Sequence, residues 1–516
     1  MAAHPSVSDL VLPSQPSLNT LLKTLKKQGL SPHNRFRSIL RDADFVASAV
    51  ASLGRRPLVA NERCGSWYVE PARKAGSAYF KSTDGHTGQW GFSCRRLNLH
   101  LLDLIEENDG CIIVDSTRRG KRMPDALSKT IPIWCAVINM ALFPDLPASH
   151  TLHTPPNVVP STEHAQISAL LPTFLSSLQA LNLDLPSLRS KLSKPLRPYW
   201  VTPETRLQEQ QEGAGPREAV FEDFRPVVCC TASSRSSSEL STFEGYVQGA
   251  ADDTEHWAMG LTAPIFWQHA DLLLSTDDAD LPGVIARLLE EEKREREADG
   301  DAERGVKVSA CMYVCQLPLS EPAAGSDNEC QIVFLDDAVT PRDGWVKGPR
   351  RMELGLGNAR NASKNLRSAL PAVSAFVERF LGFPSSEEVL RPGVQGRRDP
   401  PEEGNQELHK EESRVLQEDT KGAEAEVAGK SRGNVRIVIA CPTGKDLSLA
   451  TALALHCRLF TPDDKPLQKP LEDASMNKAA IRQRLGRMMI AFPGANPQRA
   501  TLQSVNRREM GQGVAQ

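Results

Sequence analysis

The sequence predicts a mixed α/β protein with more than one domain. The chain has 516 residues, which is more than a single hydrophobic core usually organises. Apolar runs at 110–116 and 225–233 are typical of fully buried strands, and a third run at 437–440 passes directly into a loop and a helix-forming segment. Strands that alternate with helical segments in this way indicate an α/β fold.

The overall composition is that of an ordinary globular protein. Hydrophobic residues make up 40% of the chain and charged residues 24%, with a net charge of -3, so bulk charge points to neither nucleic acid nor membrane. The charge is unevenly spread, because 13 Lys/Arg stand against 9 Asp/Glu between Arg55 and Lys129. A locally basic domain fits a polyanionic partner, and a solvated surface is the simpler alternative.

The sequence carries no signal for secretion, a membrane or an obligate protein partner. The 11 cysteines are scattered, without a CxxC pair or zinc-ligand spacing, so we expect reduced thiols in a cytoplasmic protein. The first residues lack the pattern of a signal peptide. The uncharged stretch at 131–144 is too short to span a bilayer and is expected to form a buried helix.

Changes in pattern divide the chain into four parts. Residues 1–30 are expected to form a flexible tail, and residues 31–325 a first domain that includes a helix at about 283–300. The second domain comprises 326–390 and 434–510. The charged passage 391–433 contains no aromatic residue and no isoleucine, so it is expected to be a disordered insertion that buries little surface.

The second domain contains a strand, a cysteine loop and a helix in direct succession. Cys441 ends the apolar run, and Gly444 can supply a sharp turn before the helix. Cysteine phosphatases hold phosphate in such a loop, among backbone N–H groups and the helix N-terminus. A strand and a long amphipathic helix precede the insertion, and this order predicts the second half of a dual-specificity-phosphatase fold.

The loop lacks the arginine that a cysteine phosphatase requires. That arginine follows the cysteine by six positions and clamps two phosphate oxygens in the transition state, but the position is Leu447 here. We therefore expect the loop to bind phosphate for another chemistry, with an active phosphatase and a structural relic as alternatives. The expected phosphate-binding residues are Cys441, Gly444, Lys445, Asp446 and Ser448.

Two polar segments of the first domain carry candidate functional residues. The loop 79–96 contains Lys81, Asp84 and His86, followed by Arg95 and Arg96. This density of polar groups is unusual for a simple connection, although each residue taken singly is more often structural. A further block at 252–267 contains two tryptophans, which we expect in the core, with a ribose or base pocket as the alternative.

The second polar segment follows the buried strand at 111–115. Asp115 stands at the carboxyl end of that strand, where ligands of open α/β sheets bind. Hydroxyls, a glycine and cations follow, and they suit a phosphorylated ligand or a nucleic-acid backbone, with a solvated turn as the alternative. These residues are Ser116, Thr117, Arg118, Arg119, Lys121 and Arg122.

Five segments together resemble the initiator-tRNA phosphoribosyltransferases of fungi and plants. They are KSTDGHTGQWGFS, IIVDSTRRGKRMPDALSKTIPIWCAVIN, EHWAMGLT, CPTGKDLS and the terminal QRLGRMM…NPQRATLQSVN. The resemblance spans about Arg35 to Asn506. It implies transfer of a 5-phosphoribosyl group from phosphoribosyl pyrophosphate to the 2′-OH of adenosine 64 in initiator methionine tRNA, which excludes that tRNA from elongation. It also implies a phosphatase-like fold for the C-terminal part.

The implied chemistry suggests roles for the candidate residues. Asp84, His86 or Asp115 would act as the catalytic base, and Asp115 or Asp446 would hold Mg²⁺ on the pyrophosphate. The cysteine loop and residues 116–121 would hold the donor. The residues expected to bind tRNA are Lys81, Arg95, Arg96, Arg122 and Lys129. The rival functions are a non-catalytic tRNA-binding protein with a phosphatase-like docking module, and an atypical phosphatase.

Overall fold

The structure, a computed structural model, divides into two compact units, Met1–Arg294 and Glu295–Gln516. It describes residues 30–54, 56–118, 120–205, 221–235, 245–298, 305–309, 311–320, 328–383, 435–471 and 476–510. The expected tail, apart from Leu30, and the expected insertion at 391–433 lie outside the described residues.

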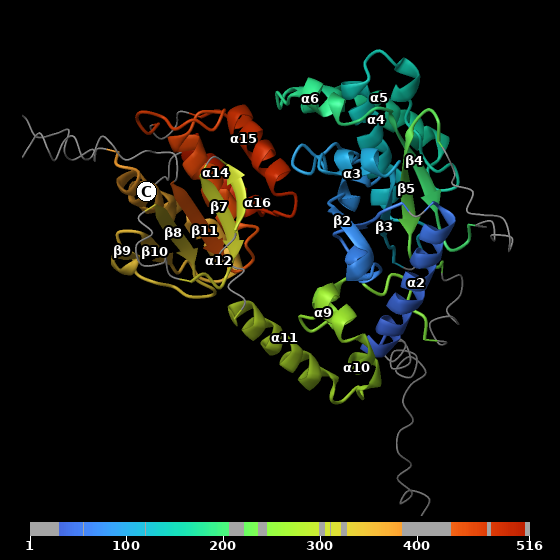
Figure 1. Ribbon diagram of the computed structural model, residues 1–516, viewed down its shortest axis with the longest axis horizontal. Coiled ribbons are helices and arrows are strands. Elements are labelled where there is room, and N and C mark those ends of the chain that lie inside the picture. Colours follow the sequence, from blue (N-terminus) through green and yellow to red (C-terminus); the bar gives the residue numbers. More distant parts are fainter. Residues whose placement is uncertain are drawn as a thin grey trace, which may run out of the picture. The chain divides into compact units, whose positions relative to one another are not determined.

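The first unit is built on a parallel five-stranded sheet (Figure 1). Its strand order is β2-β1-β3-β5-β4, and every neighbouring pair is parallel. The strands are β1 (Leu58–Asn61), β2 (Lys74–Ala78), β3 (Cys111–Asp115), β4 (Leu196–Val201) and β5 (Arg225–Thr231). All residues of β3 are buried, as parallel strands covered on both faces require. The strands predicted at 110–116 and 225–233 are confirmed.

Helices cover this sheet. The buried helix predicted at 131–144 is α4, and the helix predicted at 283–300 is α11. The helices are α2 (Pro32–Ser52), α3 (Leu101–Glu107), α4 (Ile131–Leu142), α5 (Ser161–Gln179), α6 (Leu185–Ser190), α8 (Thr254–Trp257), α9 (Ala263–Gln268), α10 (Ala270–Ser275) and α11 (Leu281–Ala298). Trp257 packs in the core against Trp67 and Phe36, with ring centroids 5.4 and 5.9 Å away, so the core assignment of this tryptophan is confirmed.

The second unit contains a six-stranded sheet of order β6-β7-β11-β8-β10-β9. The central strands β7, β11, β8 and β10 are parallel, and the edge strands β6 and β9 are antiparallel to their neighbours. The strands are β6 (Val306–Ser309), β7 (Met312–Gln316), β8 (Glu329–Phe334), β9 (Val346–Gly348), β10 (Arg351–Leu354) and β11 (Arg436–Cys441).

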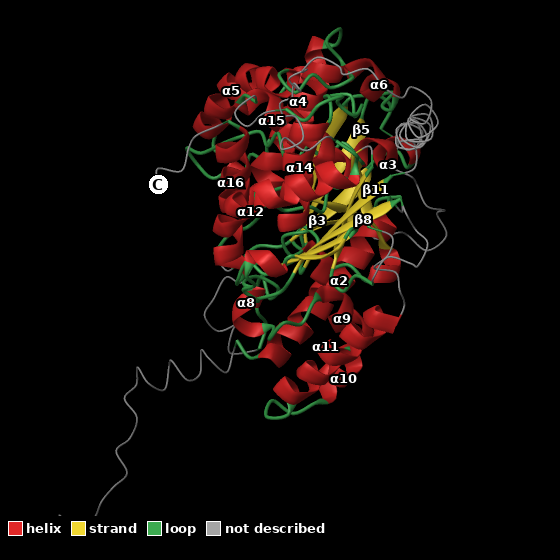
Figure 2. Ribbon diagram, turned by 90° about the vertical axis from the view of Figure 1, so that its left-hand side faces the viewer, coloured by secondary structure: helices red, strands yellow, loops and turns green. Residues whose placement is uncertain are grey.

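One face of this sheet supports a helical layer. The helices are α12 (Ala359–Phe380), α14 (Leu447–Leu459), α15 (Lys478–Ala491) and α16 (Arg499–Glu509), and together with the sheet they bury one continuous apolar core. Figure 2 shows α12, α14 and α16 beside one another along β8 and β11. The predicted order of strand, long helix, strand, cysteine loop and helix is present as β10, α12, β11, the loop and α14.

The two units divide earlier in the chain than the boundary at 325/326 that the sequence favours. Strands β6 and β7 lie N-terminal to that boundary, yet β7 pairs with β11 over Met312–Gln316. Pairing between strands so far apart in sequence leaves no local signal, because the residue pattern of a strand is the same whichever sheet the strand joins. None of the described helices is both long and apolar enough to cross a lipid bilayer.

Asp42 of α2 should make stability depend on pH. Its side chain is 2% exposed, Tyr246 donates a hydrogen bond of 2.9 Å to Oδ1, and Oδ2 has no partner among the described residues. Burial raises the pKa of this carboxyl to about 8, against about 3.9 in an unfolded chain. Between these values only the folded state holds the proton, so stability falls as pH rises, by up to about 1.4 kcal/mol per pH unit.

Asp42→Asn is therefore expected to flatten the pH dependence of unfolding. Urea titrations of the original chain and the variant at about pH 5 and about pH 8 measure both slopes. The original chain should lose stability over this interval and the variant much less. Parallel slopes would show that Asp42 ionises as in the unfolded chain.

Candidate functional site

The carboxyl end of the first sheet contains a topological switch point between β1 and β3. From β1 the chain continues to β2 on one side, whereas from β3 it continues to β4 on the other side of the sheet. Ligands of open α/β sheets bind in the crevice at this point. Asn61 is the last residue of β1 and Asp115 the last of β3, so both side chains stand at the expected place.

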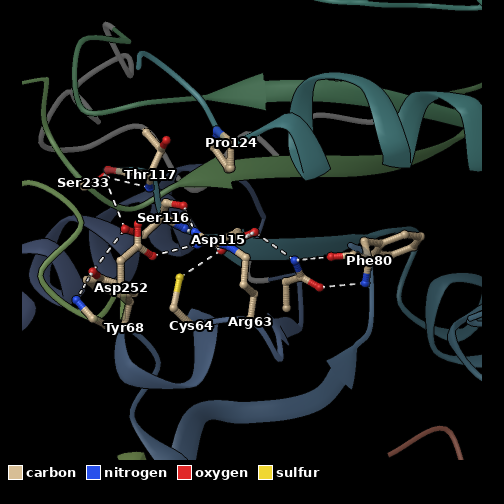
Figure 3. Close-up of polar contacts among 12 residues, drawn as sticks. Arg63, Cys64, Tyr68, Phe80, Asp115, Ser116, Thr117, Pro124, Ser233 and Asp252 are labelled. Carbon is tan, nitrogen blue, oxygen red and sulfur yellow. Dashed lines mark hydrogen bonds and ion pairs between the residues drawn. The ribbon is translucent and has the colours of Figure 1, made fainter. Parts of the chain in front are cut away.

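The Asp115 carboxylate is fully buried and surrounded by donors (Figure 3). Oδ2 accepts from Asn61 Nδ2 at 2.8 Å and from Arg63 Nε at 3.4 Å. Oδ1 accepts from Arg63 Nη2 at 3.1 Å, from the Cys64 thiol at 3.0 Å and from the backbone N–H of Ser116 at 2.8 Å. A carboxylate offers about four acceptor sites, so no lone pair of Asp115 remains for a substrate proton or a metal.

Arg63 connects this buried carboxylate to solvent. Its Nη1 donates to Asp252 Oδ1 at 2.7 Å, and Nη2 also donates to the backbone carbonyl of Ser116. The side chain is 33% exposed, whereas Asp115 is inaccessible. Burial raises the pKa of the Cys64 thiol, and the charge of Asp115 raises it further, so the thiol keeps its proton and remains a donor. Arg63 is therefore the cation that this cluster presents outward.

Hydroxyl groups hold the segment after β3 in place. Ser116 donates to the Tyr68 hydroxyl at 3.1 Å, and Ser233 exchanges hydrogen bonds with the backbone N–H and carbonyl of Thr117 at 3.3 and 3.2 Å. Gly249 has φ +68°, and a Cβ on it would meet the Thr117 carbonyl at 2.7 Å. Ser116 and Thr117 are buried, so their role is to hold the chain in place directly after β3.

The cations predicted after this segment have different surroundings. Arg118 and Arg122 are exposed, and Lys121 pairs with Asp125 at 2.7 Å while remaining 45% exposed. Arg119 lies outside the described residues.

The polar loop 79–96 meets the same edge of the sheet. Asn61 donates to the Phe80 carbonyl at 3.0 Å and accepts from the Phe80 N–H at 2.8 Å, so this loop begins beside Asp115. Thr130 donates to the Lys81 carbonyl at 3.0 Å, and Gly85 packs tightly against the backbone of Asp125. The structure thus brings together the two polar segments that the sequence singled out.

Lys81, Asp84 and Arg96 line a small cavity in this loop. Burial lowers the pKa of Lys81, and the neighbouring cations Arg95 and Arg96 lower it further. Burial also lowers the pKa of Arg96 to about 10 and raises that of Asp84. Three cations around one carboxyl repel one another, so an anionic ligand would relieve the repulsion. Arg95 is exposed, and Arg96 lies over the Tyr79 ring at 5.2 Å.

His86 and Lys129 differ in accessibility. His86 is exposed, with Nε2 3.8 Å from Asp125 Oδ2. Lys129 is 5% exposed, and its Nζ pairs with Asp125 at 3.1 Å and with Glu163 at 3.0 Å. Glu163 also accepts from the Trp90 indole at 3.0 Å. The predicted tRNA contact of Lys129 therefore gains no support, because its ammonium is buried and pairs with Glu163 of α5.

The cysteine loop of the second unit has the expected shape. Gly444 has φ +64°, and a Cβ there would meet the backbone N of Gln316 at 2.7 Å, so the turn requires glycine. Cys441 is 1% exposed, and its thiol donates to the Ser448 hydroxyl at 3.3 Å. Leu447 is buried in the apolar core, so the position of the missing arginine faces inward, while Lys445 is exposed.

Asp446 joins the cysteine loop to the start of a neighbouring helix. Its Oδ1 accepts from the backbone N–H of Gln498 at 2.9 Å, which precedes α16, and burial raises its pKa. The described residues contain no group of three or more His, Cys, Asp or Glu that could hold a metal ion. Asp115 is saturated and Asp446 ties α14 to α16, so the residues predicted as Mg²⁺ ligands do not fit an ion held by the protein.

Sequence reasoning missed Asn61, Arg63, Tyr68, Ser233 and Asp252. A signal existed for the first two, because "NER" at 61–63 directly follows the short apolar run 57–60 and so stands at a strand end. Ser233 ends the run predicted as a strand at 225–233 and lies two residues after the end of β5. Tyr68 and Asp252 reach the site through tertiary packing, which no local pattern reveals.

Comparisons with known proteins cover both units. The family model described as the Rit1 N-terminal domain matches residues 25–290, and the model described as the Rit1 DUSP-like domain matches residues 405–508. A Saccharomyces cerevisiae protein, tRNA A64-2′-O-ribosylphosphate transferase, is 32% identical over 95% of this chain and 94% of its own. An uncharacterized protein of Schizosaccharomyces pombe is 49% identical over 269 residues, which is 51% of this chain and 57% of that relative. No solved structure matches.

Proposed function

The chain belongs to the Rit1 family, and on this premise we propose that it is a tRNA ribosylphosphate transferase acting on the 2′-oxygen of A64. The observation that carries the proposal is the alignment with the yeast transferase along 95% of the chain, because it includes both the switch-point residues and the cysteine loop. The donor would be phosphoribosyl pyrophosphate and the acceptor initiator methionine tRNA in the cytoplasm. The attached phosphate would exclude that tRNA from elongation.

The proposed reaction is a substitution at the anomeric carbon. The 2′-oxygen of A64 bonds to C1 of the donor ribose, the bond from C1 to pyrophosphate breaks, and the hydroxyl proton passes to a base. We favour Asp84 as this base over His86, since the Asp84 carboxyl is half-buried among Lys81 and Arg96 and its pKa is raised by burial. Asp115 is saturated with hydrogen bonds and would position Arg63.

The cations divide between two substrates in this proposal. In the first unit Arg63 would bind a phosphate group, and in the second unit Lys445 would be the phosphate-binding cation of the cysteine loop. The exposed cations around the crevice would contact the tRNA backbone and its 2′-OH groups across the shallow minor groove. The exposed cations are Lys81, Arg95, Arg118 and Arg122, and the half-buried Arg96 would join them. Mg²⁺ would arrive with the donor's pyrophosphate, which is how this ion commonly binds.

Incubation with initiator tRNA and a donor labelled in its 5-phosphate tests the function. Label should enter the tRNA and localise to A64, and an initiator tRNA with 2′-deoxyadenosine at that position should stay unlabelled. Tight tRNA binding without labelling of either tRNA would favour the non-catalytic tRNA-binding alternative.

Cys441→Ser is expected to retain transfer activity within about threefold of the original chain. The thiol is buried and donates to Ser448, and the loop holds no arginine to clamp a phosphoryl transition state, so Cys441 should not attack phosphorus. Initial rates of tRNA labelling measure the effect, and hydrolysis of an aryl phosphate by the original chain is a parallel assay. Loss of transfer with normal donor binding, or cysteine-dependent phosphate release, would support phosphatase-type chemistry.

Lys445→Ala is expected to raise the KM for the donor about tenfold with little change in kcat. The side chain is exposed on the cysteine loop, so its loss should remove a charge contact without disturbing the fold. Lys465→Ala provides a matched control, because this lysine is also exposed in the second unit but lies outside the loop. An unchanged donor KM would remove the cysteine loop from the donor site.

A further inference from the structure

The second unit contains a cavity of about 290 Å³ at the far end of α14 from the cysteine loop. It lies between β6, α14, α15 and the turn that follows α14. The polar residues that line it are Lys307, Ser309, His456, Asp464, Arg484 and Arg487. From Leu447 at the start of α14 to His456, the helix rise of about 1.5 Å per residue gives a separation of roughly 14 Å. The cavity is thus distinct from the Cys441 loop.

Two buried side chains form its inner wall. Arg484 is 5% exposed, its Nη2 donates to the Phe460 carbonyl at 3.3 Å, and its Nε has no partner among the described residues. His456 is 3% exposed, and its Nε2 lies 2.6 Å from Asp464 Oδ1. A buried guanidinium that donates to one neutral carbonyl among the described residues is costly unless an anion approaches it.

The positive charge of the cavity exceeds its negative charge. Asp464 is the one carboxylate among the lining residues of the described chain, and its Oδ1 accepts from both Ser309 and His456 at 2.6 Å. Arg487 approaches Asp463, a side chain that is 78% exposed, at 3.5 Å, and such surface pairs contribute little. Lys307 of β6 is exposed and also lines the cavity.

We propose that this cavity is a second anion site, which binds a phosphate group between Arg484 and Arg487 of α15 and Lys307 of β6. Both arginines belong to the segment QRLGRMM, for which the transfer reaction supplies no other role. Planar guanidinium groups suit phosphate oxygens. The cavity is open beside Lys307 and Arg487, so a phosphate that is part of a larger chain can enter. The phosphate group could belong to the tRNA backbone or to free pyrophosphate. The choice of these two ligands rests on the proposed function, whereas the anion site itself does not.

The test uses a Lys307→Ala/Arg487→Ala double variant of the full chain, since both side chains reach solvent and their loss should not prevent folding. Arg482→Ala is the matched control, an exposed arginine on the same helix outside the cavity lining. Binding of initiator tRNA is measured by filter retention over a salt series without donor, and binding of pyrophosphate by calorimetry. Thermal melting of all variants checks the fold.

The double variant is expected to bind tRNA about tenfold more weakly. The slope of its log affinity against log salt concentration should fall by the equivalent of about one to two phosphate contacts. Arg482→Ala should bind tRNA like the original chain. Unchanged tRNA binding with lost pyrophosphate binding would retain the site and identify the free anion as its ligand. Unchanged binding of both ligands would overturn the proposal. Because neither assay involves turnover, a chain that binds but never transfers label would contradict the proposed function alone.

Discussion

Asp115→Ala is expected to lower the free energy of unfolding by roughly 3–5 kcal/mol and to abolish transfer. The substitution removes the acceptor for Asn61, Arg63, Cys64 and the Ser116 N–H at once. The Arg63 guanidinium, which is two-thirds buried, loses its contact with the Asp115 carboxylate. The buried donors of Asn61, Cys64 and Ser116 lose their acceptor as well. Urea unfolding followed by circular dichroism measures the loss of stability, and tRNA labelling measures the loss of activity.

Asp115→Asn is the matched control, because it keeps the volume and part of the hydrogen bonding but removes the charge. We expect an intermediate loss of stability, since the amide NH₂ would face donors instead of accepting from them. If Asp115→Ala unfolded at the same urea concentration as the original chain, the carboxylate could not be the structural centre of this hydrogen-bond cluster.

Arg63→Gln is expected to reduce kcat/KM for the donor by a factor on the order of 10² to 10³. Arg63 is held by Asp115 at 3.1 Å and by Asp252 at 2.7 Å, yet its side chain remains one-third exposed. The guanidinium is therefore fixed in position and still accessible to a ligand. In the proposed reaction a positioned cation of this kind would bind the charge that develops on the leaving pyrophosphate. Initial rates at varied donor concentration, with tRNA saturating, measure the effect.

Two further variants separate charge from fold. Arg63→Lys keeps a positive charge but loses the planar fork, so it should recover only part of the activity. Arg73→Gln removes an exposed arginine of the same unit and should leave the rate unchanged. Donor kinetics of Arg63→Gln that match those of Arg73→Gln, in a chain that still melts cooperatively, would exclude Arg63 from the donor site.

The candidate site was partly predictable because strand ends carry local signals. The run CIIVD predicts a buried strand that delivers Asp115 to a carboxyl edge, and the structure places it there. Its role was not predictable. A lone aspartate after a strand looks like a base or a metal ligand, whereas five donors from β1, the turn after β1 and Ser116 make it a structural anchor.

Lys129 shows the same limit for charge. In the sequence it extends a run of cations, and nothing marks it as buried. The structure pairs it with Asp125, four residues earlier, and with Glu163 on α5. The second partner is remote in sequence, so only the packing of α5 against this loop converts a candidate tRNA contact into an internal ion pair.

The sequence by itself determined the α/β class, the buried strands β3, β5 and β11, the glycine turn after Cys441, and the missing phosphatase arginine at Leu447. These features depend on residue order over a few positions, through apolar periodicity and backbone conformation. The tertiary structure alone decided that β6 and β7 join the second sheet, that β1 and β3 form the switch point, and that Arg63 becomes the accessible cation there. Those outcomes depend on which strands pair and which charges meet across long stretches of chain, and the local sequence does not encode such pairings in a readable form.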